Sequence, residues 1–227
     1  MAAKSAVSKN LLIVESKNDQ YFIEGLIKYL KLNNIELGTP ICNIEDYECL
    51  GGLGNLSRRL RDLKKEIESK GLEKIGILID ADDEGIENRI ELINGAIKEI
   101  CSDVSFTRIN EPKHSQELDI DFICYITNVN GYGELETLLK AIKSKDSTFA
   151  DCLKSWRKCA KKFGREIKDK EFDKFWFNIY CRYDCCAEEE RKQAGKNCNT
   201  ETSLKKDIWD FEHSLLDGLK EFLRLLA

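Results

Sequence analysis

Two runs of consecutive apolar residues, each leading into carboxylates, most constrain what this chain can fold into. Leu11-Leu12-Ile13-Val14 is followed by Glu15, and Ile77-Leu78-Ile79 is followed by Asp80-Ala81-Asp82. An apolar run without polar alternation is typical of a parallel strand whose two faces are both covered by helices. Ligands bind at the carboxyl ends of such strands, so we expect Glu15, Asp80 and Asp82 to meet in one crevice.

Carboxylates held close together repel one another, and a divalent cation relieves that repulsion. Mg²⁺ takes oxygen ligands and commonly joins carboxylates to substrate phosphates. The pattern therefore predicts a site for Mg²⁺ (or Mn²⁺) and chemistry on phosphate esters. A short acidic cluster after a strand also has a simpler interpretation, because Asp and Glu stabilise the first turn of a helix.

At these residues the chain resembles the Toprim domain, which topoisomerases, bacterial primases and overcoming-lysogenization-defect nucleases share. Glu15 matches the glutamate after the first strand, and residues 80–85, closing with Gly85, match Asp-x-Asp-x-Glu-Gly after the third. Asp19 fits the Glu-x-x-x-Asp spacing of the nucleases, whereas Glu15-Ser16-Lys17 is closer to type IA topoisomerases. Gly51 and Gly52 fall where the family often has a glycine turn.

The resemblance to the Toprim pattern covers roughly residues 10–130. Two later segments, Gly133-Glu134-Leu135-Glu136 and Trp209-Asp210-Phe211-Glu212-His213, are similar to small stand-alone Toprim proteins of uncharacterised function. The resemblance implies an α/β fold with a Toprim-like (Rossmann-like), mostly parallel sheet, covered by helices on both faces, and a helical C-terminal elaboration. We expect the Toprim-like domain over residues 1–130 and the helical region, packed on it, over residues 131–227.

The acidic residues have candidate roles if a metal is bound. Asp80 and Asp82 are two residues apart, so their side chains share a face and can reach one cation. Glu84 is a candidate third ligand, or a residue that holds a metal-bound water. Glu15 is a candidate general base or ligand of a second metal, with Asp19 as a further ligand in that case.

The reaction that these roles favour is hydrolysis of a phosphodiester by water. Lys17 or Arg89 would neutralise the charge that develops on the phosphate, since Arg89 follows Gly85 by one helical turn. Topoisomerases and primases use the same acids, but they need further domains for which this chain has no room. Two alternatives remain open: a Mg²⁺-dependent nuclease acting on DNA or RNA, and a catalytically silent Toprim-fold binding or regulatory module.

Related Toprim nucleases often work with an ATPase in antiviral defence or repair. This chain has no Gly-x-x-x-x-Gly-Lys-Ser/Thr loop, so any such ATPase would be a separate subunit.

Composition excludes other classes of protein. Of 227 residues, 42% are hydrophobic and 34% are charged, values typical of globular chains, and no apolar stretch approaches the roughly 18 residues of a membrane span. The segment Met1–Ser5 lacks the apolar core of a secretion signal, so we expect a cytoplasmic protein whose ten cysteines are reduced thiols. The net charge of -5 argues against bulk attraction to nucleic acid but leaves room for a local basic patch.

Such a patch lies in residues 154–174, where cations alternate with Trp156, Phe163 and Phe172. It is either a track for a nucleic-acid backbone or a solvated helix face whose aromatic residues lie in the core. The candidate nucleic-acid-binding residues are Arg157, Lys158, Lys161, Lys162 and Arg165.

The alternating apolar pattern predicts the order of the helices and strands. We expect strands over residues 10–14, 41–50, 75–79, 104–109 and 122–128. We expect helices over residues 19–32, 55–70 (ending at Gly71) and 84–101, with an almost wholly helical chain from Glu134 onward.

Further residues have structural interpretations. Glu134 and Glu136 precede an apolar helix and are interpreted as first-turn capping residues rather than ligands. His114 and His213 are isolated, so a structural role is favoured for each. Leu215–Leu226 form an apolar helix that docks on its own core, which we favour, or on a second copy, which leaves a homo-oligomer open.

Four cysteines, which lie close together in the sequence, lack the paired short spacing of structural zinc sites, so we favour ordinary helix packing over zinc. They are Cys181, Cys185, Cys186 and Cys198.

Overall fold

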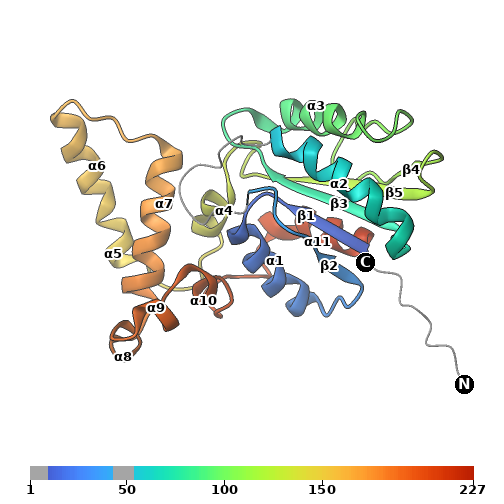
Figure 1. The fold of residues 1–227 in the computed structure, drawn as a ribbon. Helices are drawn as coiled ribbons and strands as arrows, with labels where there is room; N and C mark the ends of the chain where they lie inside the picture. The colour runs from blue at the N-terminus through green and yellow to red at the C-terminus, as the bar shows by residue number, and fades with distance from the viewer. Residues whose placement is uncertain (1–9, 43–53) are drawn as a thin grey trace, which may run out of the picture.

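The chain folds around a five-stranded, mostly parallel sheet with helices on both faces, an α/β, Rossmann-like arrangement (Figure 1). The computed structural model describes residues 10–42 and 54–227. The strand order is β2-β1-β3-β5-β4, and only β4 runs antiparallel to its neighbour. The strands are β1 (Asn10–Val14), β2 (Ile35–Leu37), β3 (Lys74–Asp80), β4 (Lys113–Ser115) and β5 (Ile120–Thr127).

The central strands form because their side chains are buried on both faces, as their unbroken apolar sequence predicts. Leu11 and Ile13 of β1 belong to one core cluster, and Leu12 and Val14 belong to the other. The sheet therefore separates two cores. Successive side chains of a strand point into different cores, but the sequence shows no alternation because both faces require apolar residues.

Helices α2 (Asn55–Lys70) and α3 (Gly85–Ile97) cover one face of the sheet, and α1 (Lys17–Leu30) and α11 (Asp217–Leu226) lie on the other (Figure 1). α11 contacts β3 and β5. Gly76 of β3 makes this approach close, because a Cβ there would lie 2.7 Å from the Leu226 side chain. The predicted docking of the apolar C-terminal helix on its own core is confirmed. Its buried members include Leu216, Leu219, Phe222, Leu223 and Leu226.

The chain after β5 is mainly helical and extends from the carboxyl ends of the strands (Figure 1). Its long helices α4 (Leu135–Ala141) and α7 (Asp169–Ile179) contribute to the same core cluster as β1 and α1. The division at residue 130 stays a prediction, since this core cluster includes residues on both sides of it. The remaining elements are α5 (Thr148–Asp151), α6 (Leu153–Lys162), the π-helical turn η2 (Tyr180–Asp184), α8 (Glu188–Arg191), α9 (Ala194–Asn197), α10 (Thr200–Leu204) and the 3₁₀ turn η3 (Ser214–Leu216).

Most of the predicted elements are present. The strand over residues 10–14 and the helix over 55–70 are confirmed, and Gly71 ends that helix with a φ of +60°. The predicted strands at 75–79 and 122–128 correspond to β3 and β5, and the helix at 84–101 is shorter, ending at Ile97.

Two predicted strands differ. Most of the predicted strand at 41–50 lies outside the described residues. The strand that pairs with β1 is β2, which is three residues long and lies before this range. The predicted strand at 104–109 is wrong. The Asn94 side chain accepts the backbone N–H of Phe106 (2.7 Å) and donates to its carbonyl (2.9 Å), so this backbone is satisfied without a strand partner.

None of the helices in the described ranges, 10–42 and 54–227, has both the length and the apolar character needed to cross a membrane.

Candidate functional site

Five carboxylates gather at the carboxyl edge of the sheet, and we call them the acidic cluster. They come from the end of β1, the first turn of α1, the end of β3 and the first turn of α4. The members are Glu15, Asp19, Asp80, Glu134 and Glu136.

Glu15 and Asp80 meet directly, although they are far apart in the sequence. Glu15 Oε2 accepts the backbone N–H of Asp80 at 3.0 Å. An aspartate carboxylate reaches no more than about 5 Å from its own backbone nitrogen, so the two carboxyl groups lie within about 8 Å of one another. Burial raises the pKa of Glu15, and the nearby Asp82 charge adds to the rise. The two residues therefore lie together at the carboxyl edge of the sheet, as the strand pattern predicts.

Asp19 lies in the first turn of helix α1, near enough to Glu15 for the two charges to interact. Its Oδ2 accepts the backbone N–H (2.9 Å) and the hydroxyl (2.6 Å) of Ser16, the N-cap of the helix. The side chain is buried, and burial together with the Glu15 charge raises its pKa to about 7. Asp19 therefore has two roles: it caps the start of helix α1, and it is a member of the acidic cluster.

Asp80 is the best-buried acid at the end of β3. Its Oδ2 accepts the backbone N–H of Leu135 at 3.3 Å, which ties the end of β3 to the start of α4. Its Oδ1 is buried and has no hydrogen-bond partner among the described residues. Burial raises the pKa of Asp80 well above its usual range, and the Asp19 and Glu15 charges raise it further.

Glu134 and Glu136 join the cluster from α4. Both lie in the first turn, as predicted, but both are also buried beside the other carboxylates, which sequence reasoning missed. Glu136 Oε1 accepts the side-chain amide of Asn18 at 3.4 Å. Burial and the Glu136 charge raise the pKa of Glu134 to about 7, and Glu134 Oε1 has no partner in the described chain. The signal was the Glu-x-Glu spacing, which places both acids at one helix end.

Asp82 is held differently from the cluster. It has a φ of +49°, and its carboxylate lies between two cations: Arg89 at 2.6 Å and Lys170 of α7 at 2.7 Å. Lys170 and Lys174 also approach Glu134 Oε2, at 3.3 and 3.6 Å. Asp82 and Arg89 thus neutralise each other in this structure, and the roles of Asp82 as a metal ligand and of Arg89 as a phosphate contact stay predictions.

The other predicted residues are not members of the acidic cluster. Glu84 is exposed at the start of α3. The charges that most change the pKa values of Glu15, Asp19 and Asp80 belong to residues other than Glu84. Lys17 begins α1, next to the cluster in sequence. Gly85 has a φ of +81°, and a Cβ there would lie 3.1 Å from the Tyr132 ring, so the predicted turn requires glycine. Gly51 and Gly52 lie outside the described residues.

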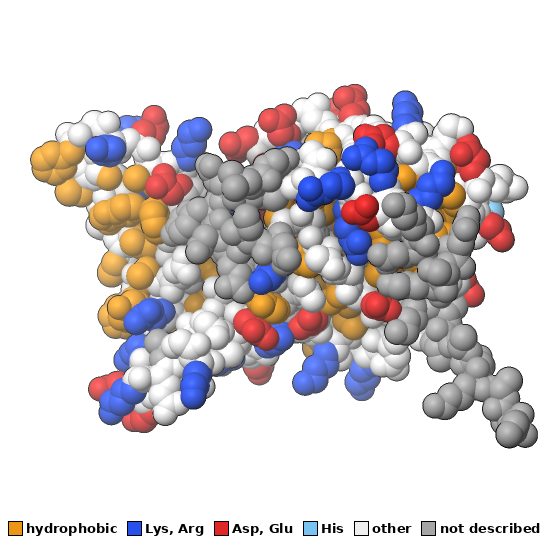
Figure 2. Space-filling model, in the orientation of Figure 1, with side chains coloured by type: hydrophobic (Ala, Val, Ile, Leu, Met, Phe, Trp, Pro, Cys, Tyr) orange, Lys and Arg blue, Asp and Glu red, His pale blue; other side chains and the backbone are white. Residues whose placement is uncertain are grey.

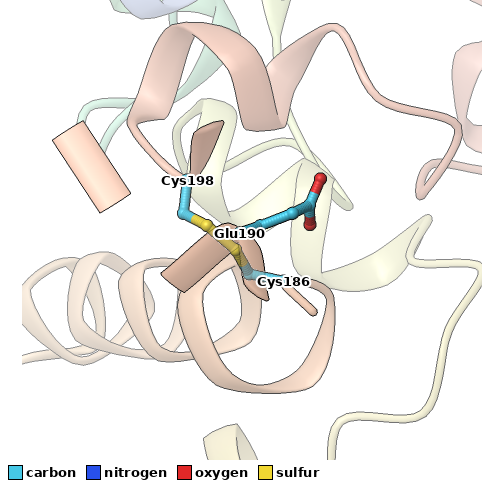
Figure 3. A group of neighbouring side chains, drawn as sticks. All are labelled: Cys186, Glu190 and Cys198. Carbon is cyan, nitrogen blue, oxygen red and sulfur yellow. A yellow bond between two sulfur atoms is a disulfide. The ribbon is translucent and has the colours of Figure 1, made fainter. Parts of the chain in front are cut away.

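The donor set of the acidic cluster fits a hard divalent cation. It consists of carboxylate oxygens, two of which are buried without partners among the described residues. Burial, and then the repulsion between the carboxylates, raises the pKa of Asp19, Asp80 and Glu134. The oxygens are spread more widely than the ligands of one ion. Over residues 10–42 and 54–227, three ligand atoms lie within 4.8 Å of one another only at Cys186, Glu190 and Cys198 (Figure 3).

That second group is a disulfide rather than a thiolate site. The sulfur atoms of Cys186 and Cys198 are bonded, because the chain through α8 and α9 returns to bring the two Cα atoms within 6.1 Å (Figure 3). The expectation that every cysteine is a reduced thiol is therefore wrong for this pair. The described free cysteines are Cys101, Cys124, Cys152, Cys159, Cys181 and Cys185.

The predicted basic residues lie on and just after α6, away from the acidic cluster. Trp156 and Phe163 are exposed there, whereas Phe172 is buried under the helix. Arg157, Lys158, Lys161 and Lys162 belong to α6, and Arg165 follows it.

Comparison with known proteins gives one match over nearly the whole chain. A family model described as "Protein of unknown function (DUF3226)" matches residues 9–227. The ribosomal protein uS12 methylthiotransferase RimO of Chlamydia abortus is 29% identical over 129 residues, 57% of this chain and 27% of that protein. The chain thus spans about a quarter of the length of this relative. No solved structure matches it.

Proposed function

The chain belongs to the DUF3226 family, and we propose that its acidic cluster makes it a divalent-metal-dependent nuclease of the Toprim type. The observation that carries the proposal is the convergence of the half-buried Glu15, which follows β1, with buried carboxylates of α1, β3 and α4, while Asp80 Oδ1 and Glu134 Oε1 lack partners in the described chain. Buried carboxylates without partners are costly, and a cation that binds them offsets that cost. In this proposal the sheet is a Toprim-like core and the helices from α4 onward are its elaboration.

Asp80 and Glu15 are the residues that would hold the metal, with Asp19, Glu134 or Glu136 as further ligands. Mg²⁺ or Mn²⁺ would polarise a phosphate oxygen and lower the pKa of a bound water. Asp82, which was a ligand candidate, would instead serve to position Arg89 and Lys170 beside the crevice.

The chain's own contribution to hydrolysis would be to place charge and to accept a proton. Burial raises the pKa of Glu15, so its carboxylate is a stronger base than an exposed one and is suited, as an alternative to binding the metal, to take a proton from water. Lys170 lies half exposed at the opening of the crevice, where its ammonium can pair with a phosphodiester. An ATPase would be a separate subunit of a defence or repair system.

The test is cleavage of plasmid DNA, single-stranded DNA and RNA in the presence of Mg²⁺ or Mn²⁺. We expect cleavage by the wild type, and loss of it in Asp80→Ala and in Glu15→Ala. Glu87→Ala, an exposed carboxylate of α3, is the matched control and should cleave like the wild type. Cleavage that survives both cluster substitutions would refute the assigned site.

A second candidate is a catalytically silent binding or regulatory module of the same fold. It is favoured by one observation: Arg89 and Lys170 already neutralise Asp82, so part of the predicted site needs no metal. Absence of cleavage by the wild type, alone and with a cognate ATPase, together with retained Mg²⁺ binding, would support this module over the nuclease.

A further inference from the structure

Helix α6 lies beside α7 at the outer, left-hand end of the molecule, and none of its residues is buried (Figure 1). The segment from Leu153 to Arg165, which we call the arm, contains six Lys and Arg residues and no Asp or Glu, in a chain of net charge -5. Such a concentration of one sign of charge creates a local field that attracts polyanions.

Most of the arm's cations are not used inside the protein. Arg157 pairs with Asp169 at 2.7 Å and Lys154 with Asp151 at 3.1 Å. The other four are exposed, and their side chains have no hydrogen bond or ion pair with any described residue. They are Lys158, Lys161, Lys162 and Arg165.

Exposed aromatic rings accompany these cations. Phe163 is 81% exposed and Trp156 is 42% exposed, and both belong to the arm. Phe149 of α5 and Tyr183 of η2 extend the exposed aromatic surface beside it, with ring centroids 6.3 Å apart. Figure 2 shows hydrophobic side chains gathered over α5 and α6 at the left of the view. Large rings in water are costly, and in a cationic setting they are suited to stack on nucleic-acid bases.

Two cavities that share Lys140 lie at the arm and at Glu134 of the acidic cluster. The first, of about 470 Å³, is lined by Arg157, Lys158 and Lys161 of the arm and by Lys140 of α4. Its apolar wall is Phe172, whose ring centre lies 4.8 Å from Lys140 Nζ and 5.1 Å from the Arg157 guanidinium carbon.

The second cavity, of about 270 Å³, shares Lys140 with the first and is also lined by Asp82, Glu134 and Lys170. Tyr132, 59% exposed, lies at the same cavity. Lys140 pairs with Asp173 at 2.5 Å, and Lys170 pairs with Asp82 and Glu134. Cations with rings beside them therefore line both cavities, and those nearest the acidic cluster are already ion-paired.

From this arrangement we propose that the arm binds single-stranded nucleic acid and directs its backbone along Lys140 and Lys170 toward the acidic cluster. The inference deepens the proposed nuclease function and rests on it for its biological purpose. Single strands are favoured over duplex because Phe163 and Trp156 can stack only on bases whose faces are accessible. The unpaired cations favour nucleic acid over an apolar protein partner, which would leave them without counter-ions.

The test is binding of a fluorescein-labelled dT20 oligonucleotide, measured by anisotropy in EDTA at several salt concentrations. We expect a dissociation constant of roughly 1–100 µM for the wild type, weakening as salt rises. Lys158→Ala/Lys161→Ala should bind more weakly and reduce the slope of log K against log salt by about 1.4, or 0.7 for each lost contact. Phe163→Ala should weaken binding about 5- to 100-fold without changing that slope.

The matched control is Lys28→Ala/Lys98→Ala, which removes two exposed lysines from α1 and the end of α3 and should bind like the wild type. A 20-base-pair duplex should respond to the lysine pair but not to Phe163→Ala. Binding that is equal in all variants would overturn the inference. So would light scattering in which Phe163→Ala or Trp156→Ala dissociates a wild-type dimer, because the arm would then be an interface between copies.

Binding in EDTA also separates this inference from the proposed function. Asp80→Asn should bind dT20 like the wild type while losing cleavage. An arm variant that cleaves a dinucleotide substrate normally but no longer binds dT20 supports the arm independently of the catalytic site.

Discussion

Lys170 Nζ lies 2.7 Å from Asp82 Oδ1, so one ammonium from α7 reaches across to the turn that follows β3. The same nitrogen lies 3.3 Å from Glu134 Oε2. The two carboxylates raise the pKa of Lys170, which keeps the ammonium charged. A fixed positive charge therefore stands at the edge of the acidic cluster, where it opposes the entry of a second cation.

The first prediction is that Lys170→Ala tightens binding of Mg²⁺ or Mn²⁺. Removing one positive charge beside the carboxylates should lower the dissociation constant by about 5- to 10-fold. Isothermal titration with Mn²⁺ measures it. Lys168→Ala, an exposed lysine two residues away, is the control and should leave the affinity unchanged. Equal affinities for all three proteins would show that the charge of Lys170 has no effect on metal binding.

The second prediction compares two residues of the acidic cluster, Asp80 and Glu15, with the exposed Glu84. Asp80→Asn and Glu15→Gln should each reduce metal-dependent cleavage at least about 100-fold, because a ligand or base is lost. Glu84→Gln, whose carboxylate is exposed, should stay within about threefold of the wild type, a change of less than about 1 kcal/mol. Initial rates on a labelled oligonucleotide measure both. A loss at Glu84 as large as that at Asp80 would restore the residue to the metal site.

The third prediction concerns pH in the absence of metal. The pKa of Asp19 is about 7 in the folded protein, above its ordinary value of 3.8, so the folded state binds the proton more tightly. The contribution of this group to stability is complete below about pH 4 and is lost as pH rises to about 7. The free energy of unfolding should therefore fall over this range, as urea denaturation in EDTA would measure.

Asp19→Asn should flatten that dependence and raise the free energy of unfolding at pH 8 by about 2 kcal/mol. Asp62→Asn, on the exposed side of α2, should leave the profile unchanged. Adding Mg²⁺ at pH 8 should stabilise the wild type more than Asp19→Asn. If the free energy of unfolding depends on pH in the same way in the wild type and in Asp19→Asn, the Asp19 carboxylate is not a buried charge without compensation.

The fourth prediction uses two glycines of α3. Gly85→Ala should lower the free energy of unfolding by about 1–2 kcal/mol, because the residue has a φ of +81° and its new Cβ meets Tyr132. Gly95→Ala, where a Cβ meets nothing within 4 Å, should raise it by about 0.5–1 kcal/mol. Denaturant titration of both variants checks the pair. Destabilisation of similar size at both positions would mean that the helix itself, rather than the turn, is sensitive.

The elements that the sequence predicts well are those whose cause is local. β1 follows from an apolar run, and α2 follows from helical spacing ended by Gly71. β2 was missed because it is three residues long and half-buried, too short for any period to show. The error at residues 104–109 has a different cause. There the Asn94 side chain, ten or more residues earlier in the chain, replaces the strand partner.

The candidate site divides in the same way. Glu15 and Asp80 were predictable because each ends a buried strand, and parallel strands bring such ends together. The participation of Glu134 and Glu136 depends on the packing of α4 against β3, through the Leu135 N–H and Asp80, which no local pattern reveals. The engagement of Asp82 by Lys170 depends on α7, 88 positions further along the chain.

Asp19 links the acidic cluster to the start of helix α1. Its carboxylate holds the amide and hydroxyl of Ser16, so any change in its charge, by a proton or by an ion, alters the first turn of α1. Helix α1 packs against α10 at its other side. The Ser16 amide, which donates to the Asp19 carboxylate, is therefore a natural spectroscopic reporter of the charge on Asp19.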